Sequence, residues 1–412
     1  DPDIFREAGK RIRSMARAAD HLTVEERIER ITTIFNTFRN PDKETVLTPW
    51  RVVNMHLGDC LGGYCFYDKA DSQTPLQLPR HIDHGEVTTS VFSAESRVLE
   101  INSKSGLYPL YVAYNIYRSR MEEARQKYGE VNRAFAQSLW DNTIEQNIFV
   151  ICKTPMARDI TRRTLVGFRS TRVNAQYYKD LIDVIKNNPA TFVNEVRDGR
   201  RFWKANNLDH MKFNAIVGNP PYQVMDGGAG ASAMPIYNKF VEISKLIKPM
   251  YISLIMPSRW FSGGRGLDDF RKDMIEDKRI RLLHDYINGR ECFPNVEIKG
   301  GVCYFLWYQK WDKECTIVSH FDDEVATTTR FLRENDDDIF IRDYRLVGIK
   351  DKVQKSSYKS FITLVSSMKP YGLRGDFFKD ASKYNLPPVK EIKGSHDITI
   401  YGLDQQLHRV KR

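Results

Sequence analysis

The sequence lacks the features that mark several common classes of protein. It contains no run of about eighteen apolar residues, so we expect no membrane-spanning helix and no membrane partner. Neither G-x-G-x-x-G nor G-x-x-x-x-G-K-[ST] occurs, which disfavours a dinucleotide site and a P-loop triphosphate site. The six cysteines form no C-x-x-C pair and show no matching histidine spacing, which argues against a zinc site. We therefore expect reduced thiols, no bound metal and a cytoplasmic location.

The composition is that of a globular protein with an excess of positive charge. The 412 residues are 41% hydrophobic and 28% charged, and they suffice for two or three domains. The formal net charge is +10, and residues 156–172 alone hold five arginines and one aspartate. This balance favours nucleic acid as a partner. The sequence opens DPDIFREAGK without an initiator Met or a signal-peptide pattern, so we expect it to be part of a longer polypeptide.

Strand patterns alternate with helix patterns along most of the chain. Helices are predicted at 22–38, where Thr23 and Glu26 fit a capping box, and in segments near 51–63, 107–129, 159–168, 236–247 and 267–277. Strands are predicted at 97–101, 147–151, 213–219, 251–258, 281–288 and 300–309. Residues 68–95 are expected to be irregular. This alternation predicts an α/β fold whose sheet is mostly parallel.

The character of the sequence changes near residue 311. Short strands in a charged background are predicted at 313–321, 327–332 and 338–349. We therefore divide the chain into a helical N-terminal segment at 1–60, an α/β domain at 61–310 and the start of a further domain at 311–412.

The segment FNAIVGNPPYQVMDGG, residues 213–228, joins a buried strand to two prolines. Prolines end the strand, because they cannot donate a ladder hydrogen bond, and they stiffen the backbone. Asn219 and Tyr222 are therefore expected to stand rigidly at the carboxyl end of a strand, where α/β sheets bind their ligands.

This arrangement suits a planar amine such as the 6-amino group of adenine. The side-chain oxygen of Asn219 and the carbonyl of Pro220 can accept both amine hydrogens, while Pro221 stiffens the turn. Tyr222 can stack on the base, an interaction that contributes roughly 1–3 kcal/mol. A base inside a duplex is out of reach, so it has to be flipped into the pocket. The glycine-rich stretch 223–235 is either a loop that closes over such a base or an ordinary surface loop.

A second corner lies at residues 97–120, where a strand, a glycine turn and a helix follow one another. Gly106 allows close approach of a ligand to the backbone, and Glu100 can accept hydrogen bonds from an amine or a hydroxyl. Such a corner is typical of a site for a nucleotide-like cofactor.

Together these motifs resemble the S-adenosylmethionine-dependent amino-methyltransferases. Asn219-Pro220-Pro221-Tyr222 after a strand is similar to their active-site motif, and Thr48-Pro49 resembles their cofactor motif in the gamma order. FNAIVGNPPYQ, PIYNKFVEIS and LIMPSRWF are similar to adenine-specific DNA methyltransferases of restriction–modification systems. The resemblance implies a Rossmann-like sheet with helices on both faces, S-adenosylmethionine as cofactor and double-stranded DNA as substrate. It also implies that residues 61–310 are the catalytic domain and that residues 311–412 are the start of a target-recognition or accessory region. The rest of a larger polypeptide or a restriction subunit is the further partner that it implies.

The cofactor residues implied by this resemblance are Thr48, Pro49, Glu100, Asn102, Gly106, Cys152 and Asp209. Some of these positions depart from the family pattern. Lys104 replaces the first glycine of the cofactor loop, and Cys152 and Thr154 stand near the place of the usual ribose-binding acid. Either Asp209 or Asp198 is the acid expected before Asn219.

Three alternatives stay open at this point. A degenerate methyltransferase fold could hold DNA for a nuclease or motor elsewhere in a larger protein. Other enzymes with this tetrapeptide modify ribosomal RNA or a protein glutamine. Asp285 with Glu297-Ile298-Lys299 also mimics the acid pattern of metal-dependent nucleases.

Overall fold

The computed structural model describes residues 2–38, 47–68, 74–205, 209–224, 234–294, 296–321, 324–333, 340–355, 397–401 and 407–411. The chain divides into two compact units, Asp1–Tyr344 and Arg345–Arg412. The second unit contains helix α12 (Arg345–Lys355) and an antiparallel hairpin of β14 (Asp397–Tyr401) and β15 (Leu407–Lys411). Among the helices in the described ranges, none combines the length and apolar character needed to cross a membrane.

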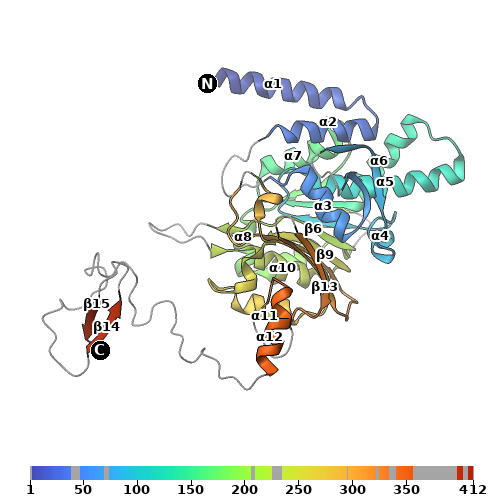
Figure 1. The fold of residues 1–412 in the computed structure, drawn as a ribbon. Coiled ribbons are helices and arrows are strands. Elements are labelled where there is room, and N and C mark those ends of the chain that lie inside the picture. The colour runs from blue at the N-terminus through green and yellow to red at the C-terminus, as the bar shows by residue number, and fades with distance from the viewer. Residues whose placement is uncertain are drawn as a thin grey trace. The chain divides into compact units, whose positions relative to one another are not determined.

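A nine-stranded sheet forms the centre of the first unit (Figure 1). Its strands, in order across the sheet, are β13 (Glu324–Arg330), β12 (Cys315–Phe321), β10 (Ile280–Tyr286), β11 (Val302–Tyr308), β9 (Tyr251–Pro257), β6 (Ala215–Gly218), β3 (Val98–Ile101), β4 (Ile148–Cys152) and β5 (Asn174–Tyr177).

Strands β9, β6, β3, β4 and β5 pair parallel to one another, whereas β11 lies antiparallel between β9 and β10. Strand β12 is parallel to β10, and β13 is an antiparallel edge strand. The predicted α/β class and mostly parallel sheet are confirmed. Parallel strands end at one edge of a sheet, so β3 and β6 present the residues that follow them side by side.

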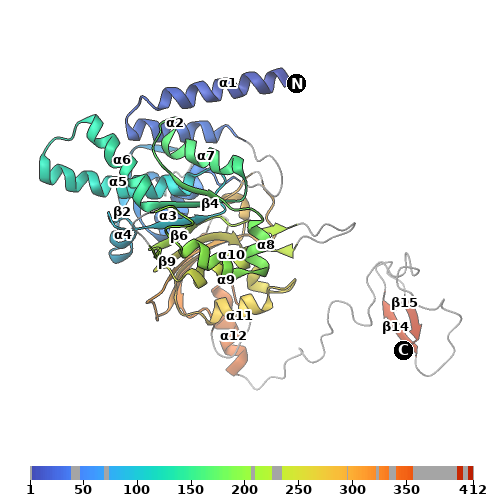
Figure 2. The ribbon, with the colours of Figure 1, turned by 180° about the vertical axis from the view of Figure 1, so that it is seen from behind.

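Helices cover both faces of this sheet (Figures 1 and 2). On one face pack helices that share a core cluster with Val150, Val217 and Tyr304: α3 (Trp50–Cys60), α4 (Glu86–Val91), α5 (Leu107–Tyr128), α6 (Arg133–Asn147) and the end of α7 (Pro155–Val166). On the other face pack α8 (Leu181–Asn187), α9 (Pro189–Arg197), α10 (Tyr237–Ile247), the 3-10 turn η1 (Ser258–Ser262) and α11 (Asp268–Glu276). Side chains alternate between these two cores along each strand, as the pleat of a strand dictates.

Two N-terminal helices, α1 (Pro2–Ala19) and α2 (Val24–Asn36), precede this layer. The predicted capping box at the start of α2 is confirmed, because Thr23 and Glu26 bond reciprocally. Arg27 of α2 is 3% exposed and lies 3.5 Å from the carboxylate of Asp20. Its guanidinium donates to the last carbonyls of α7, those of Arg163, Thr164 and Leu165. Helix α2 therefore caps the carboxyl end of α7 with a buried cation.

Some predicted elements are wrong. Residues 68–95, expected to be irregular, contain β2 (Pro75–Ile82) and α4 (Glu86–Val91). Strand β2 is largely exposed, so it lacks apolar alternation, and its ladder comes from pairing with β1 (Gly63–Tyr67). The strand predicted at 338–349 is replaced from Arg345 onward by α12, where Leu346, Ile349 and Val353 follow helical spacing.

The end of the first unit also lies beyond the boundary predicted at residue 310. Strands β12 and β13 extend the large sheet, because β12 pairs with β10 over residues 316–320 and β13 pairs with β12. The first compact unit therefore extends to Tyr344. The separate N-terminal segment at 1–60 stays a prediction. The recognition or accessory role of residues 311–412 also stays a prediction.

Candidate active site

The site begins where β6 runs into Asn219. All four residues of β6 are buried. Gly218 ends the strand with φ +149°, and a Cβ there would lie 3.2 Å from Cγ of Glu100. Only a residue without a side chain lets the end of β6 approach the end of β3 this closely. The two predicted corners of the site are therefore neighbours in space.

Asn219 is 5% exposed and connects distant parts of the chain. With its amide turned to satisfy both ends, Oδ1 accepts a hydrogen bond from Thr48 Oγ1 at 2.9 Å. The amide nitrogen then donates to the Tyr222 hydroxyl at 3.0 Å and to the carbonyls of Ile255 and Pro220 at 3.3 Å. The fold thus brings together Thr48 and Asn219, which are 171 positions apart.

Tyr222 stands beside Asn219 with its ring edge-on to a second aromatic residue. The ring centroids of Tyr222 and Phe293 are 6.5 Å apart, at an interplanar angle of 82°. Burial raises the pKa of Tyr222 well above its usual value, so the hydroxyl stays neutral. Phe293 did not appear among the predicted site residues. Its signal is an aromatic residue followed by a proline, Phe293-Pro294, a few residues after the predicted strand 281–288, and this only weakly marks a site.

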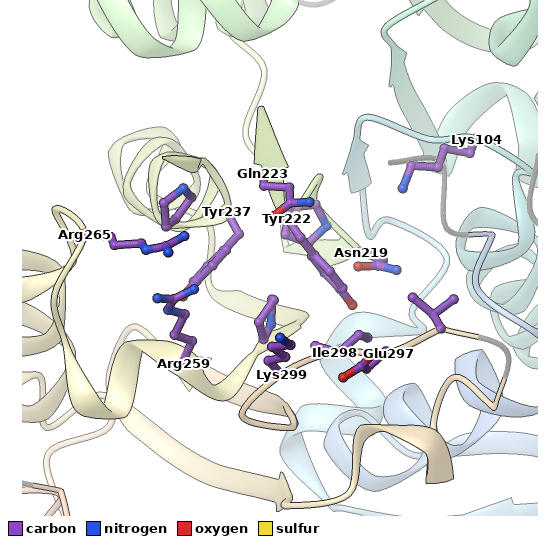
Figure 3. Close-up of a pocket in the computed structure, with 14 residues that line it drawn as sticks. Lys104, Asn219, Tyr222, Gln223, Tyr237, Arg259, Arg265, Glu297, Ile298 and Lys299 are labelled. Carbon is purple, nitrogen blue, oxygen red and sulfur yellow. The ribbon is translucent and has the colours of Figure 1, made fainter. Parts of the chain in front are cut away.

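A cavity of about 390 Å³ opens in front of Asn219 and Tyr222 (Figure 3). Its wall also includes Pro220 and residues from four other stretches of the chain, among them Lys104, Tyr237, Arg259, Arg265, Glu297 and Lys299. The predicted glycine-rich loop contributes Gln223 and Pro235, and its residues 225–233 lie outside the described part of the chain. The cavity has the polar, aromatic-lined character of a site for a planar polar ligand.

The loop after β3 is fixed by hydrogen bonds to its neighbours. The N–H groups of Asn102 and Ser103 both donate to the carbonyl of Ile151, at 2.8 and 3.0 Å. Asn102 is 4% exposed and adopts φ +70°, an unusual conformation for a residue other than glycine. Such a residue in a tightly held loop is typical of a ligand site.

Helix α7 holds the other half of this loop. Ser103 Oγ lies 3.2 Å from Thr161 Oγ1, and Thr164 donates to the carbonyl of Ser105 at 2.6 Å. Gly106 has φ +78°, and a Cβ there would lie 3.1 Å from Cα of Thr161. The predicted glycine turn is therefore pressed against α7, and its shape depends on the position of that helix.

Glu100 lies beneath this loop as a buried acid. Burial raises its pKa to about 8, although Ser103 and Lys104 act in the opposite direction. Its Oε2 atom is buried and has no hydrogen-bond partner in the described part of the chain. A buried carboxyl oxygen with an unused acceptor position fits the ammonium or hydroxyl group of a cofactor.

Thr48 and Pro49 are the remaining predicted cofactor residues. Pro49 is the N-cap of α3, next to the start of the helix predicted near 51–63. Both residues line a second cavity, of about 150 Å³, together with Ser105, Leu107 and Phe293. The Thr-Pro motif and the glycine turn, predicted separately, therefore border the same space, and this set of residues fits a nucleoside cofactor.

Two predicted cofactor residues lie elsewhere among the described residues. Cys152 is fully buried on the same side of β4 as Val150, and burial raises the pKa of its thiol to about 12. Asp209 is largely exposed and pairs with Arg200 at 2.6 Å, whereas Asp198 forms a backbone bridge with His210. Neither Cys152 nor Asp209 lines the two cavities as described.

The nuclease-like pattern is not assembled either. Asp285 is 1% exposed, and both of its carboxylate oxygens accept hydrogen bonds from Arg342 at 2.6 Å. Ser258 donates to it as well, at 2.8 Å. Glu297 and Lys299 line the cavity of Asn219 instead. Within the described ranges, no three His, Cys, Asp or Glu side chains gather as metal ligands.

Comparisons with known proteins find methylases. Residues 146–293 match the sequence model of the Eco57I restriction-modification methylase family. A protein of Mycoplasma pneumoniae (strain ATCC 29342 / M129) named "Uncharacterized adenine-specific methylase" is 28% identical over 164 residues, which are 39% of this chain and 38% of that protein. The chain thus spans well under half of the length of this curated relative.

Two solved structures illustrate the structural matches. The methyltransferase subunit of a type I restriction-modification system from Streptococcus thermophilus is 10% identical, with a TM-score of 0.39 over 83% of this chain and 59% of that one. A modification subunit of a putative type I restriction enzyme from Vibrio vulnificus is 11% identical, with a TM-score of 0.43 over 95% and 65%. Residues 146–293, which include the Asn-Pro-Pro-Tyr sequence, match the model of the Eco57I restriction-modification methylase family, and the predicted resemblance to adenine-specific methylases is confirmed over this segment.

Proposed function

We propose that this chain transfers a methyl group from S-adenosylmethionine to the 6-amino group of adenine in DNA, as the modification part of a restriction–modification system. The contact between Thr48 and Asn219 carries the proposal, because it joins the cofactor side of the site to the target side. The family match over residues 146–293 supports it, and it does not favour the alternative of a catalytically weak binding module.

The residues at the end of β6 position the amine. A carbonyl oxygen has two lone pairs, so Oδ1 of Asn219 can accept from Thr48 and from the adenine amine at once. The Pro220 carbonyl accepts the second amine hydrogen, and Pro221 keeps the turn rigid. Two fixed acceptors draw the amine nitrogen out of conjugation, which leaves its lone pair directed at the methyl carbon. Tyr222 stacks on the flipped base, and Phe293, which packs edge-on against Tyr222, holds the tyrosine ring in place.

The cofactor side orients the methyl donor, whose sulfonium supplies an activated methyl group. Glu100 receives an ammonium or hydroxyl group at its unused oxygen, and the turn from Asn102 to Gly106 lies against the nucleoside. Thr48 and Pro49 form the opposite wall. As the new N–C bond forms, the carbon–sulfur bond breaks with its electron pair passing to sulfur, and the nitrogen releases a proton to solvent.

The partners follow from this chemistry. Double-stranded DNA supplies the flipped adenine, and the basic balance of the chain suits it. Residues 311–412 serve as the start of the target-recognition or accessory region, and a larger polypeptide or a restriction subunit completes the system in the cytoplasm.

The first test is a calorimetric titration of the purified chain with S-adenosylmethionine, with Asn219→Ala beside it. One-to-one binding by both proteins is expected, because Asn219 acts on the target. Transfer of labelled methyl groups is then compared among duplex DNA, structured RNA and protein. Absence of cofactor binding at millimolar concentration, or a preference for RNA or protein, contradicts the proposal.

A further inference from the structure

Three cationic side chains gather on one side of the target cavity. Arg259, Arg265 and Lys299 line the cavity, and Figure 3 shows the guanidinium groups of Arg259 and Arg265 beside each other. Within the described ranges, none of the three forms an ion pair or a side-chain hydrogen bond, with Glu297 or with any other residue. Like charges without partners repel one another, and a bound anion would offset that repulsion, so this arrangement favours the binding of an anion.

Other arginines in the same part of the fold have protein partners, although Nε of Arg271 has none among the described residues. Arg342 binds both oxygens of Asp285, and Arg271 donates to the carbonyl of Ser262. This region therefore contains hydrogen-bond acceptors, but they bind Arg342 and Arg271 instead of the cations of the cavity. The unpaired state of the cavity cations is a local property of the cavity wall.

Arg265 lines the cavity, and its backbone has a strained conformation. Arg265 adopts φ +50°, and Gly263, Gly264 and Gly266 around it also have positive φ values. Arginine rarely adopts the left-handed region, and such outliers persist where the surrounding structure fixes them. Three flanking glycines make the tight turn feasible, and the turn places Arg265 in the wall of the cavity.

Tyr237 adds a buried polar group to the same wall. The residue is 2% exposed, and its hydroxyl has no hydrogen-bond partner of normal geometry in the described part of the chain. Figure 3 shows Tyr237 between Arg259 and Tyr222. A buried hydroxyl without a partner is costly, and a ligand oxygen next to the arginines removes that cost.

We propose that Arg259, Arg265, Lys299 and the Tyr237 hydroxyl bind a backbone phosphate of the DNA strand that carries the flipped adenine. Guanidinium groups suit phosphate because they donate several N–H bonds in one plane. Asn219 and Tyr222 lie in the same cavity and hold the base, so a phosphate of the same strand reaches the cations. Glu297, the carboxylate in the wall, repels an anion from its own side. This inference rests on the proposed function for the location of the base.

The test uses the full chain and a labelled mixed-sequence duplex. Binding is measured by fluorescence anisotropy between roughly 50 and 200 mM salt, where phosphate contacts dominate the salt dependence. The variant Arg259→Gln/Arg265→Gln is compared with Arg30→Gln/Arg125→Gln, which removes the same charge from exposed helix positions outside the cavity. We expect the cavity variant to lower the slope of log affinity against log salt by about 1.8, since each phosphate contact contributes about 0.9.

Two further measurements separate this role from others. S-adenosylmethionine affinity should be unchanged in the cavity variant, while the KM for DNA rises. Tyr237→Phe should weaken DNA binding without changing the salt slope, because it removes no charge. Inorganic phosphate should protect the wild type from thermal unfolding only weakly, since it lacks the base.

The results that test the phosphate site can be told apart from the results that test methyl transfer. Equal salt slopes for the two double variants overturn the phosphate site, even if the wild type methylates DNA. A loss of cofactor affinity in the cavity variant also overturns it, because the cations would then serve the cofactor. Strong protection by inorganic phosphate that the cavity variant loses, with unchanged DNA binding, assigns the site to a free anion. A wild type that transfers no methyl group but shows the expected slope difference contradicts only the proposed function.

Discussion

The two corners of the site differ in how side chains reach the ligand. At the end of β6, Asn219 and Tyr222 follow the strand directly, and two prolines leave the chain few alternatives. At the ends of β3 and β4, the chain uses a loop held by α7, and Cys152 turns into the core. Rigid local backbone therefore fixes the target side, whereas the cofactor side depends on contacts between distant elements.

The largest expected effect is on the target side. Asn219→Ala should abolish methyl transfer, since the amine loses an acceptor, yet it should leave cofactor affinity within about two-fold, a change of about 0.4 kcal/mol. Transfer of labelled methyl groups and calorimetry measure the two quantities. Thr48→Ser keeps the hydroxyl that donates to Asn219 and serves as the control. Near-normal turnover in Asn219→Ala would contradict the assignment.

On the cofactor side, the raised pKa of Glu100 predicts a pH-dependent stability. The folded state keeps the proton up to about pH 8, whereas the unfolded chain releases it near 4.5. The free energy of unfolding should therefore fall as pH rises through this window, by roughly 1.4 kcal/mol per pH unit at most. Urea unfolding of the wild type and of Glu100→Gln measures it. Parallel pH profiles for the two proteins would show that Glu100 does not titrate in this range.

Tyr222 allows stacking to be separated from hydrogen bonding. Tyr222→Ala should lower DNA affinity by roughly 1–3 kcal/mol, the value of a stacked base, and spare the cofactor. Tyr222→Phe keeps the ring and loses only the contact to Asn219 at 3.0 Å, which contributes about 0.5–1.5 kcal/mol. Separate dissociation constants for DNA and cofactor decide the matter. Equal losses for both ligands in Tyr222→Ala would argue against stacking.

The smallest effect is expected at Asp209. Its pair with Arg200 is exposed on both sides, and such pairs contribute about 0–1 kcal/mol. Asp209→Asn should therefore leave S-adenosylmethionine affinity unchanged in calorimetry. A marked loss of affinity would show that Asp209 moves to the cofactor on binding, and the cofactor corner would then differ less from the target corner.

The sequence predicted the features that depend on residues close to one another in the chain. The strand before Asn219, the capping box at Thr23 and the glycine turn at Gly106 each depend on residues within a few positions. It could not predict which way Cys152 points, because that depends on the register of β4 against the cores on both faces. Arg259 and Arg265 reach the target cavity from the segment after β9, whereas Phe293 lines the second cavity from the segment after β10. Their contribution depends on the tertiary fold.

The buried cation that caps α7 has a consequence for where the catalytic unit begins. Arg27 binds the last carbonyls of α7, and α7 holds the cofactor loop through Thr161 and Thr164. A protein shortened to start at Thr48 would keep every side chain proposed to touch a ligand and would still lose the support of that loop. Any transplant of this site into another scaffold therefore has to carry the segment from Asp20 onward.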